Sequence, residues 1–268
     1  MNRKTPGNKK IQTSKPVKKL GKKTEVQSSA VRLNKFIADA GVCSRRNADE
    51  LIEQSRVKVN GKVANKLGTV IEKNSSVTVD GNPVKEKLNL IYILLNKPKD
   101  CITTSKDEKG RKTVLDIVKK RDRIYPVGRL DRNTTGALLL TNDGDLAHRL
   151  THPSFQVERT YNVLLDKPMN PADASKISKG GIEIDDYSTS PCDILIFPDK
   201  KEKVMLTFTE GRNHEIKKIF ENFGYKVKQL DRKVFANLNT NGLQKGEYRH
   251  LIRKEVLSLR KQVGLKND

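Results

Sequence analysis

The sequence contains no tryptophan, only three cysteines, and aromatic residues at just 5% of its 268 positions. Cys43, Cys101 and Cys192 lie far apart and form no Cys-x-x-Cys pair, so we expect small, free thiols in place of a disulfide framework or a zinc ribbon. No run reaches the roughly 20 apolar residues of a membrane helix. The N-terminus also lacks the apolar stretch of a secretory signal. We therefore expect a cytoplasmic protein with no membrane association.

Acidic residues are also scarce, since 32 Asp and Glu stand against 54 Lys and Arg, for a net charge of +22. Such an excess indicates a polyanionic partner, most simply a nucleic acid. Residues 1–30 hold nine of the basic residues, one acidic residue and no aromatic residue. We predict that this segment is a disordered basic tail, because it cannot bury enough apolar surface to fold. It either contacts RNA or only solubilises the chain.

Residues 31–88 have the pattern of a small domain. An apolar stripe from Leu33 to Ala40 has helical spacing, and Gly41 follows where a helix favours left-handed backbone. Ser44 is a suitable N-cap for a second helix. Alternating valines then flank Asn60-Gly61, which predicts a β-hairpin.

Two arginines, Arg45 and Arg46, occupy the first turn of the second helix. The helix dipole disfavours cations there, whereas a bound phosphate would be stabilised by both the guanidinium groups and the backbone N–H groups. From the pattern alone, the two arginines are either a phosphate site or solvated side chains.

The stretch RLNKFIADAGVCSRRNADELI at 32–52, followed by VKVNGKV at 57–63, resembles an S4 RNA-binding module. The resemblance implies that residues 31–88 bind structured RNA. It assigns RNA contacts to the surface of the second helix and the following strand, namely Arg32, Lys35, Ser44, Arg45, Arg46, Lys58 and Asn60.

Residues 89–268 form a larger domain, with Lys85–Asn89 as the expected linker. Short apolar or alternating runs predict strands near 90–95, 124–127, 137–140, 161–165, 182–184, 194–196 and 204–208. Asn96-Lys97-Pro98 is expected to end the first of these strands. Helical stripes are predicted near Leu146 and from Ile216 to Phe223. Strands outnumber helices and hairpin-like turns join most of them, so we predict an α+β fold with a mostly antiparallel sheet.

Asp131 lies between Arg129 and Arg132 in a polar loop between two apolar strands. Two adjacent cations would keep this carboxylate ionised, and an ionised carboxylate can act as a nucleophile or a base. Spacing alone nevertheless favours a structural turn residue held by salt bridges.

Two other pairs of polar residues are weaker candidates for a metal site or an acid–base site. His148 and His152 have the spacing of zinc ligands, but they lack the glutamate of a His-Glu-x-x-His site. Asp143 and Asp145 could pair with Asp131 as acid and base, yet their Asn-Asp-Gly-Asp setting favours a turn and a helix cap.

The segment GRLDRNTTGALLLTNDG at 128–144 resembles the catalytic loop of pseudouridine synthases. Asn96-Lys97-Pro98, Arg159-Thr160-Tyr161, EGRNHEIKKIF at 210–220 and GEYRHL at 246–251 match further elements of that family in order. With the S4 module in front, residues 31–260 resemble the RsuA/RluB type. The segment KDEKGRKTVLDIV at 106–118 favours the RluB-like branch, which acts on large-subunit ribosomal RNA.

The resemblance implies a role for each matching position. Asp131 corresponds to the essential aspartate and Lys217 to the basic residue that pairs with it. Tyr161 corresponds to the tyrosine that stacks on the target base and is a candidate for removing the C5 proton. Ile216 corresponds to the aliphatic residue beside that pair, and Arg129 to the arginine that fills the gap left by the flipped nucleotide. Glu215 stands where glutamine is common and Lys217 where arginine is common. A lysine makes a single point contact, which would loosen the orientation of Asp131 while keeping the charge.

The implied reaction breaks the C1′–N1 bond of a uridine, rotates the base and joins C1′ to C5. A stacked base must first be flipped out of the RNA. The reaction requires no cofactor and no metal. The expected partner is ribosomal RNA, with 23S rRNA favoured, and the expected state is a monomer. The alternatives are a 16S rRNA pseudouridine synthase and a non-catalytic S4-type assembly factor.

Overall fold

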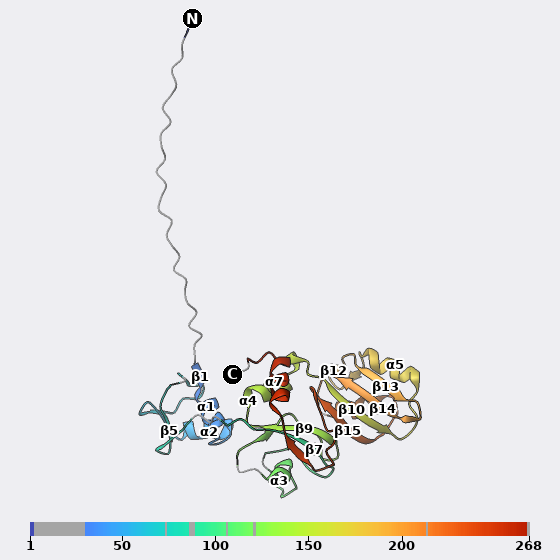
Figure 1. The fold of residues 1–268 in the computed structure, drawn as a ribbon, viewed down its shortest axis with the longest axis horizontal. Coiled ribbons are helices and arrows are strands. Elements are labelled where there is room, and N and C mark those ends of the chain that lie inside the picture. Colours follow the sequence, from blue (N-terminus) through green and yellow to red (C-terminus); the bar gives the residue numbers. More distant parts are fainter. Residues whose placement is uncertain are drawn as a thin grey trace.

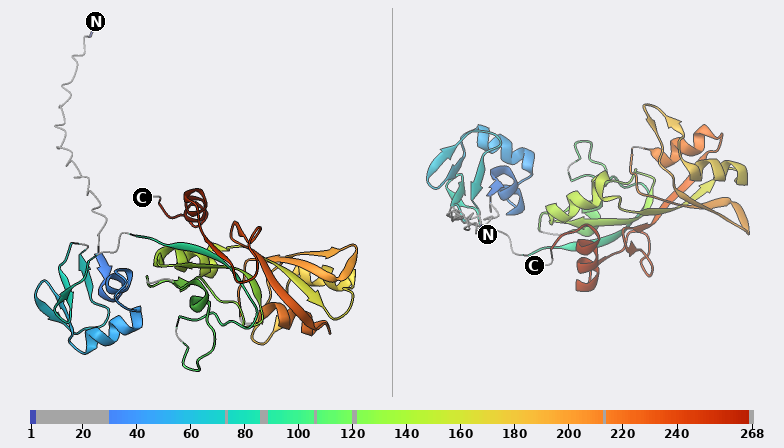
Figure 2. Two further views of the ribbon diagram at one scale, coloured as in Figure 1. Left: turned by 60° about the horizontal axis from the view of Figure 1, so that its bottom comes forward. Right: turned by 90° about the horizontal axis from the view of Figure 1, so that it is seen from above.

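The computed structural model describes residues 1–2, 30–72, 74–85, 89–105, 107–119, 122–212 and 214–266. Most of the predicted tail and the centre of the predicted linker lie outside these ranges. Figures 1 and 2 show a small domain at one end of the chain beside a larger one that contains a broad sheet. No helix in the described ranges has the length and apolar character needed to cross a bilayer.

The small domain joins two helices and short strands around one core. Helices α1 (Leu33–Asp39) and α2 (Arg45–Glu53) contribute buried Leu33, Ile37, Ala48 and Ile52. A four-stranded sheet completes the core in the order β3 (Lys62–Ala64), β2 (Val57–Val59), β5 (Val77–Val79), β6 (Asn82–Pro83). Strand β1 (Ala30–Arg32) pairs separately with β4 (Val70–Glu72).

The predicted cap and turn residues of this domain are confirmed. The Ser44 hydroxyl accepts a hydrogen bond from the backbone N–H of Asn47 at 3.1 Å. Gly41 adopts φ +82° after α1. Asn60 and Gly61 have φ of +50° and +80°, which is the geometry of a type I′ hairpin turn.

The large domain is built on a nine-stranded sheet, shown at the right of Figure 1. Its main strand order is β13 (Asp193–Phe197), β14 (Lys200–Phe208), β10 (Arg159–Leu165), β15 (Val227–Phe235), β9 (Thr135–Thr141), β7 (Tyr92–Lys97), β17 (Tyr248–His250). β8 (Tyr125–Pro126) pairs with β9, and β16 (Leu238–Asn239) pairs with β15. β11 (Glu183–Ile184) and β12 (Tyr187–Ser188) form a separate hairpin. All pairs except β9 with β15 are antiparallel, which confirms the predicted α+β class.

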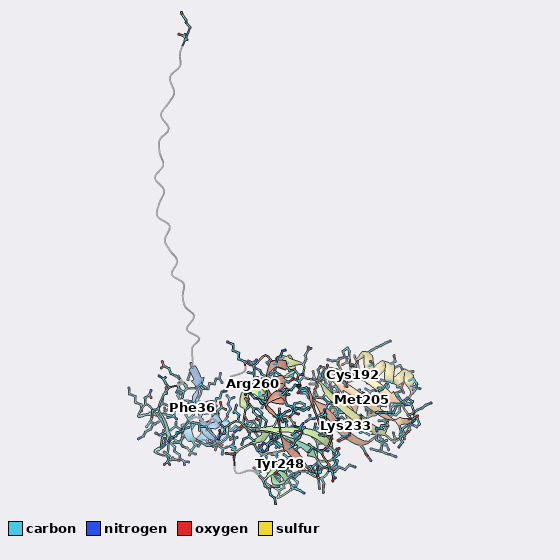
Figure 3. All side chains as sticks on the ribbon, in the orientation of Figure 1. Phe36, Cys192, Met205, Lys233, Tyr248 and Arg260 are labelled. Atoms are coloured by element: carbon cyan, nitrogen blue, oxygen red, sulfur yellow. The ribbon has the colours of Figure 1, made fainter. Side chains whose placement is uncertain are left out.

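Helices cover both faces of the large sheet. Side chains of β9 alternate between two cores, with Leu138 and Leu140 in one and Ala137 and Leu139 in the other. The first core also receives α3 (Val114–Val118), α5 (Pro171–Lys179) and α6 (Glu215–Asn222). The second receives α4 (Gly144–Thr151), the 3₁₀ turn η1 (Pro153–Phe155) and α7 (Arg253–Gln262). Figure 3 shows side chains filling both domains.

Two predictions for the large domain were wrong or incomplete. Strand β7 continues through Asn96 and Lys97, which were expected to end it, because both polar side chains find buried partners. The Asn96 side chain donates to the Leu243 carbonyl at 2.8 Å. Helices α5 and α7 were not predicted, because few of their residues are buried and their apolar stripes are short.

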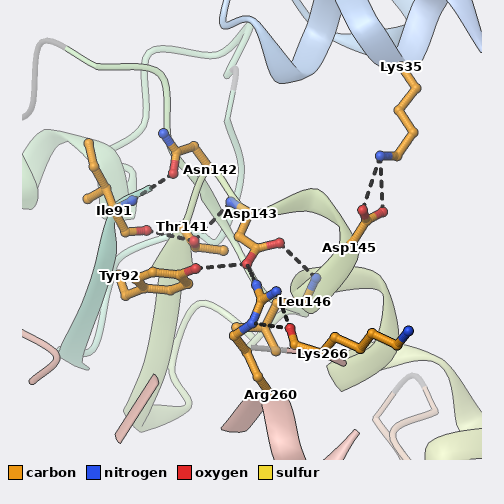
Figure 4. A network of polar contacts seen from close by, with 10 residues as sticks. All are labelled: Lys35, Ile91, Tyr92, Thr141, Asn142, Asp143, Asp145, Leu146, Arg260 and Lys266. Atoms are coloured by element: carbon orange, nitrogen blue, oxygen red, sulfur yellow. Dashed lines mark hydrogen bonds and ion pairs between the residues drawn. The ribbon is translucent and has the colours of Figure 1, made fainter. Parts of the chain in front are cut away.

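A buried ion pair attaches α7 to the rest of the domain (Figure 4). Asp143 caps α4 by accepting the backbone N–H of Leu146 at 3.0 Å. Its other oxygen accepts the Tyr92 hydroxyl at 2.8 Å and lies 3.1 Å from Arg260 on α7. Asp143 is thus a structural cap, as the sequence indicated, and its second oxygen fixes the C-terminal helix.

The parallel pair brings β9 and β15 unusually close together. Gly136 on β9 is in register with Arg232 on β15 and has φ +110°. A Cβ atom at Gly136 would lie 2.1 Å from the Arg232 carbonyl oxygen. Only glycine therefore permits this approach.

We predict that Gly136→Ala lowers the free energy of unfolding by more than about 3 kcal/mol, because the methyl group forces the two strands apart. Gly246→Ala is the matched control, since Gly246 has φ +93° and a Cβ there would meet nothing within 4 Å. It should cost only about 1–2 kcal/mol. Urea denaturation followed by circular dichroism measures both values, and equal losses would contradict the close approach.

Candidate active site

A pocket of about 420 Å³ opens where β9, β10 and β15 meet. Its wall is formed by the loop that leads into β9, the start of β10, the loop between β14 and α6, and the middle of β15. All five large-domain residues that the resemblance singled out line it, namely Arg129, Asp131, Tyr161, Ile216 and Lys217. Segments far apart in the sequence thus converge on one cavity.

Asp131 is held by side chains from α6 and from the residue before that helix, and not by its neighbouring arginines. The Lys217 ammonium donates to Oδ2 of Asp131 at 2.8 Å, and Nε2 of His214 lies 3.4 Å from Oδ1. Arg132 turns away and donates to Asp100 at 2.6 Å. The expectation that Arg132 flanks this carboxylate was therefore wrong, because adjacent side chains in a tight turn point in different directions. Arg129 is exposed in the pocket wall.

A fully buried lysine fixes the loop that carries Asp131. Nζ of Lys97 donates to the backbone carbonyls of Asp131, Arg132 and Thr134 at 2.9–3.1 Å, and also to that of Pro98. Burial lowers the pKa of Lys97 to about 8, although the nearby Cys101 and Asp131 side chains favour the charged form. Lys97 was not among the predicted site residues, although a lysine at the end of an apolar strand is a signal that could have found it.

Thr103 holds the same loop from another direction. Its hydroxyl donates to the Leu130 carbonyl at 2.8 Å and accepts the Leu130 N–H at 3.3 Å. The backbone on both sides of Asp131 is therefore tied to the domain, so the carboxylate is fixed before any substrate arrives.

Helix α6 presents Lys217 to the pocket. His214 precedes the helix in the left-handed conformation, with φ +54°, and turns the chain into it. Ile216 is 5% exposed, packs in the core and also lines the pocket. Because Lys217 and His214 each contact a different oxygen of Asp131, the histidine supplies the second contact that a lysine alone cannot make.

Glu215, the first residue of α6, is a buried carboxyl in the pocket wall, only 3% exposed. One of its oxygens accepts the Arg212 backbone N–H at 3.0 Å. Burial, together with the nearby Glu210 carboxyl, raises the pKa of Glu215 to about 7. The departure from glutamine noted in the sequence therefore places a titratable group beside the reaction pocket.

Aromatic and guanidinium groups complete the wall. Tyr161 is 7% exposed, and its ring centroid lies 5.7 Å from that of Phe208. Arg159 and Arg232 are also buried in the pocket wall. Neither arginine was among the predicted site residues.

The small domain distributes its predicted RNA-binding residues between two kinds of position. Arg32, Arg45, Arg46 and Lys58 are exposed. Ser44 caps α2, and Asn60 accepts the Ser76 N–H at 2.9 Å, so both polar groups already have structural partners. The Lys35 ammonium lies 2.9 Å from Asp39 and 3.1 Å from Asp145 on α4, and so connects the two domains (Figure 4).

The competing clusters do not form a second site. Asp143 and Asp145 lie outside the pocket wall and are engaged by Arg260 and Lys35. His152 ends α4 and accepts the Ser154 N–H at 3.3 Å. In the part of the chain that the structure describes, no three His, Cys, Asp or Glu side chains are placed to bind one metal ion. The three cysteines are free and at least partly buried, as predicted.

Comparisons with known proteins identify the family of the chain. Residues 91–222 match the RNA pseudouridylate synthase family, and residues 31–77 match the S4 domain. The chain is 43% identical to ribosomal large subunit pseudouridine synthase B of Bacillus subtilis, over 85% of this chain and 95% of that protein. It is 36% identical to the dual-specificity RNA pseudouridine synthase RluF of Escherichia coli, over 88% of this chain and 80% of that protein. A crystal structure of a pseudouridylate synthase superposes with a TM-score of 0.62 and 31% identity, over 85% of this chain and 99% of that one.

We predict that Glu215→Gln changes how stability depends on pH. In wild type, the native state keeps the Glu215 proton up to a pKa of about 7, whereas the unfolded chain loses it near the ordinary value of 4.5. Stability from this group is therefore present below pH 4.5 and is lost as pH rises towards 7. The amide cannot ionise. Between pH 4.5 and 8, the free energy of unfolding of the variant should therefore come to exceed that of wild type by up to about 3 kcal/mol.

Urea denaturation at several pH values measures this difference. Glu221→Gln is the matched control, because Glu221 lies exposed on the same helix. Its stability should follow that of wild type at every pH. If the Glu215 variant does the same, Glu215 does not titrate in this range.

Proposed function

Because the chain belongs to the RNA pseudouridylate synthase family, we propose that it isomerises uridine to pseudouridine in ribosomal RNA, with Asp131 as the catalytic carboxylate. One observation carries the proposal. The Asp131–Lys217 ion pair, with an N–O distance of 2.8 Å, lies in the wall of a pocket that also contains Tyr161. This set of groups suits a reaction on a single base that has left its stack.

In the proposed reaction, the target uridine flips into the pocket and its uracil stacks on Tyr161. Asp131 attacks the nucleoside or removes a proton from it, and the C1′–N1 bond breaks. The uracil then rotates and C5 bonds to C1′, and any bond between Asp131 and the nucleoside is broken. C5 finally loses its proton, with Tyr161 as the candidate base, and N1 gains a proton. Atoms and electrons balance within the nucleoside, so neither an oxidant nor a hydrolytic water is consumed.

The remaining pocket residues position these groups. Lys217 and His214 each contact one oxygen of Asp131 and so limit rotation of the carboxylate. Ile216 packs in the core and lines the same pocket. Arg129, exposed at the pocket wall, is suited to fill the space that the flipped nucleotide leaves in the RNA. Every one of these residues comes from one chain, so the proposal requires only a monomer.

We propose 23S rRNA as the substrate. The 43% identical relative from Bacillus subtilis is named for the large ribosomal subunit, and it aligns over nearly its whole length. Action on ribosomal RNA also implies a cytoplasmic location. The residues from 31 to about 88 would act as the RNA-anchoring domain and the rest as the catalytic domain, because the first part matches the S4 domain and contains no part of the pocket.

The S4 domain would bind RNA through its exposed basic side chains. Arg45 and Arg46 stand at the N-terminus of α2, and Lys58 lies on β2. Backbone N–H groups at that helix end add further donors for phosphate. Ser44, Asn60 and Lys35 would shape this surface and its link to the catalytic domain through the structural contacts described above.

We predict that Asp131→Asn abolishes catalysis, with at least about a 10³-fold loss of rate, because an amide is neither a base nor a nucleophile. The assay measures tritium release from ribosomal RNA labelled at C5 of uracil. Asp199→Asn, a change at an exposed turn between β13 and β14, should leave the rate unchanged. Equal release by wild type and Asp131→Asn would exclude Asp131 as the catalytic group.

The target follows from mapping pseudouridine at each rRNA position in a deletion strain. Loss of one or more 23S pseudouridines is expected. Loss of a 16S pseudouridine would instead assign the substrate to the small ribosomal subunit. If every pseudouridine persists while immature subunits accumulate, the chain acts as an assembly factor.

We predict that the double change Arg45→Ala and Arg46→Ala weakens RNA binding and lowers the slope of log K against log salt concentration by about 1.5, because two phosphate contacts are lost. The control changes Lys176 and Lys179 to Ala, which removes the same charge from α5 at the far end of the molecule (Figure 1). Filter binding from low to moderate salt measures both slopes. Identical slopes for the two double variants would mean that Arg45 and Arg46 contribute only to overall charge.

A further inference from the structure

Two buried guanidinium groups lie in the pocket wall without a carboxylate partner. Arg159 is 8% exposed and Arg232 is 2% exposed, and both line the pocket. They flank one ring, since their guanidinium carbons lie 5.7 and 4.6 Å from the centroid of Phe235. Among the described residues, no salt bridge involves either arginine. Buried cations without anionic partners are costly, so the pocket is suited to negative charge.

The two arginines differ in how their donors are used. Arg159 donates to the backbone carbonyls of Val157, Thr209 and Glu210, and so ties β10 to the loop after β14. Arg232 donates from Nε to the Ala137 carbonyl at 2.8 Å, but its Nη2 is buried and has no hydrogen-bond partner. An unpaired buried donor is unfavourable, and more so when it is charged. Arg232 therefore has one charged donor that no described group of the protein uses.

Sheet register puts this donor next to the proposed base-stacking residue. Arg232 on β15 is paired directly with Tyr161 on β10. Side chains that are directly opposite in neighbouring strands share one face of the sheet, with Cβ atoms roughly 5 Å apart. A uracil that stacks on Tyr161 would thus have its edge within reach of the Arg232 guanidinium.

We propose that Arg232 is a catalytic residue, whose Nη2 donates to a carbonyl oxygen of the target uracil and stabilises the negative charge that forms on the ring. The proposal rests on the proposed function and extends it. When the C1′–N1 bond breaks, its electron pair stays on the uracil and spreads over O2 and O4. If Asp131 instead adds to the ring at C6, the electron pair moves to O4.

O4 becomes negative in both routes, so the role of Arg232 does not depend on which route operates. The ring returns to neutral when C5 bonds to C1′, after which C5 loses its proton and N1 gains one. A fixed donor in a buried site stabilises such transient charge more than water does.

A uracil oxygen fits this position better than an RNA phosphate. Nη2 has almost no solvent-exposed area, so it suits a single planar acceptor that enters beside Tyr161. A phosphate group carries its own hydration and suits exposed cations such as Arg129 and Arg212 at the same pocket.

The test uses two variants. Arg232→Met keeps an apolar side chain of similar length but removes the N–H donors, and Arg232→Lys keeps the charge but not the planar guanidinium group. Lys233→Met is the matched control, because Lys233 is the next residue, is 46% exposed and carries the same charge (Figure 3). Single-turnover rates of loss of the target nucleoside are measured at saturating RNA with uridine or 5-fluorouridine at the target position, by chromatography of nuclease digests. 5-Fluorouridine has no C5 proton to lose, so this readout compares the steps up to the joining of C5 to C1′. Filter binding gives Kd, and urea denaturation reports folding.

Arg232→Met should slow the single-turnover rate on uridine by about 10²–10³-fold, with Kd within about threefold of wild type. Its defect should be smaller on 5-fluorouridine, because the fluorine itself stabilises the base anion. Arg232→Lys should have an intermediate rate, and Lys233→Met should match wild type. If Arg232→Met does not fold, the rate defects of Arg232→Lys on uridine and on 5-fluorouridine are compared instead, and a smaller defect on 5-fluorouridine supports the proposal.

Three results would overturn the proposal. A weaker Kd and a shallower salt slope with an unchanged rate at saturation would mean that Arg232 binds phosphate. Equal defects on both bases would mean a structural role, and a wild-type rate for Arg232→Lys would mean that the guanidinium is not needed. Failure of the proposed function is a separate outcome, in which wild type itself forms no pseudouridine in ribosomal RNA.

Discussion

The parallel pairing of β9 with β15 is the constraint on which the site depends. Only two residue pairs, Thr135 with Asp231 and Gly136 with Arg232, form this ladder, yet they join the two halves of the large sheet. The loop that carries Asp131 ends where β9 begins, and β15 carries Arg232 opposite Tyr161. A carboxylate from one half therefore faces an aromatic ring and a helix from the other. The absence of a side chain at position 136 allows the two backbones to approach this closely.

Buried cations, rather than the overall charge, shape the reaction pocket. Lys97 holds the carbonyls of the Asp131 loop from beneath, and Arg159 holds the opposite wall in the same way. In both cases a charged side chain organises irregular backbone that has no strand partner of its own. The net charge of +22 has a different effect, because it acts over longer distances and favours the approach of RNA in general.

The small domain combines a local architecture with one specific connection. Its helices and hairpins form around their own apolar core. Lys35 then joins α1 to Asp145 on α4, in the same stretch where Asp143 anchors α7. The resemblance to the S4 module assigned Lys35 to RNA, because sequence alone does not distinguish an exposed lysine from one that joins two domains.

The sequence alone determined what depends on near neighbours. Ser44, Gly41 and Asn60-Gly61 specified caps and a hairpin turn, because these conformations are set by a few adjacent residues. Resemblance to a family identified Asp131, Tyr161 and Lys217 as a group, but not how they are held. Asp131 and Lys217 lie 86 positions apart, and the arginine beside Asp131 bonds elsewhere. Only the tertiary structure decided that Lys217 on α6 and His214 before it contact Asp131, that Lys97 supports its loop and that Arg232 faces Tyr161. Strand order and register bring together residues that no local pattern relates.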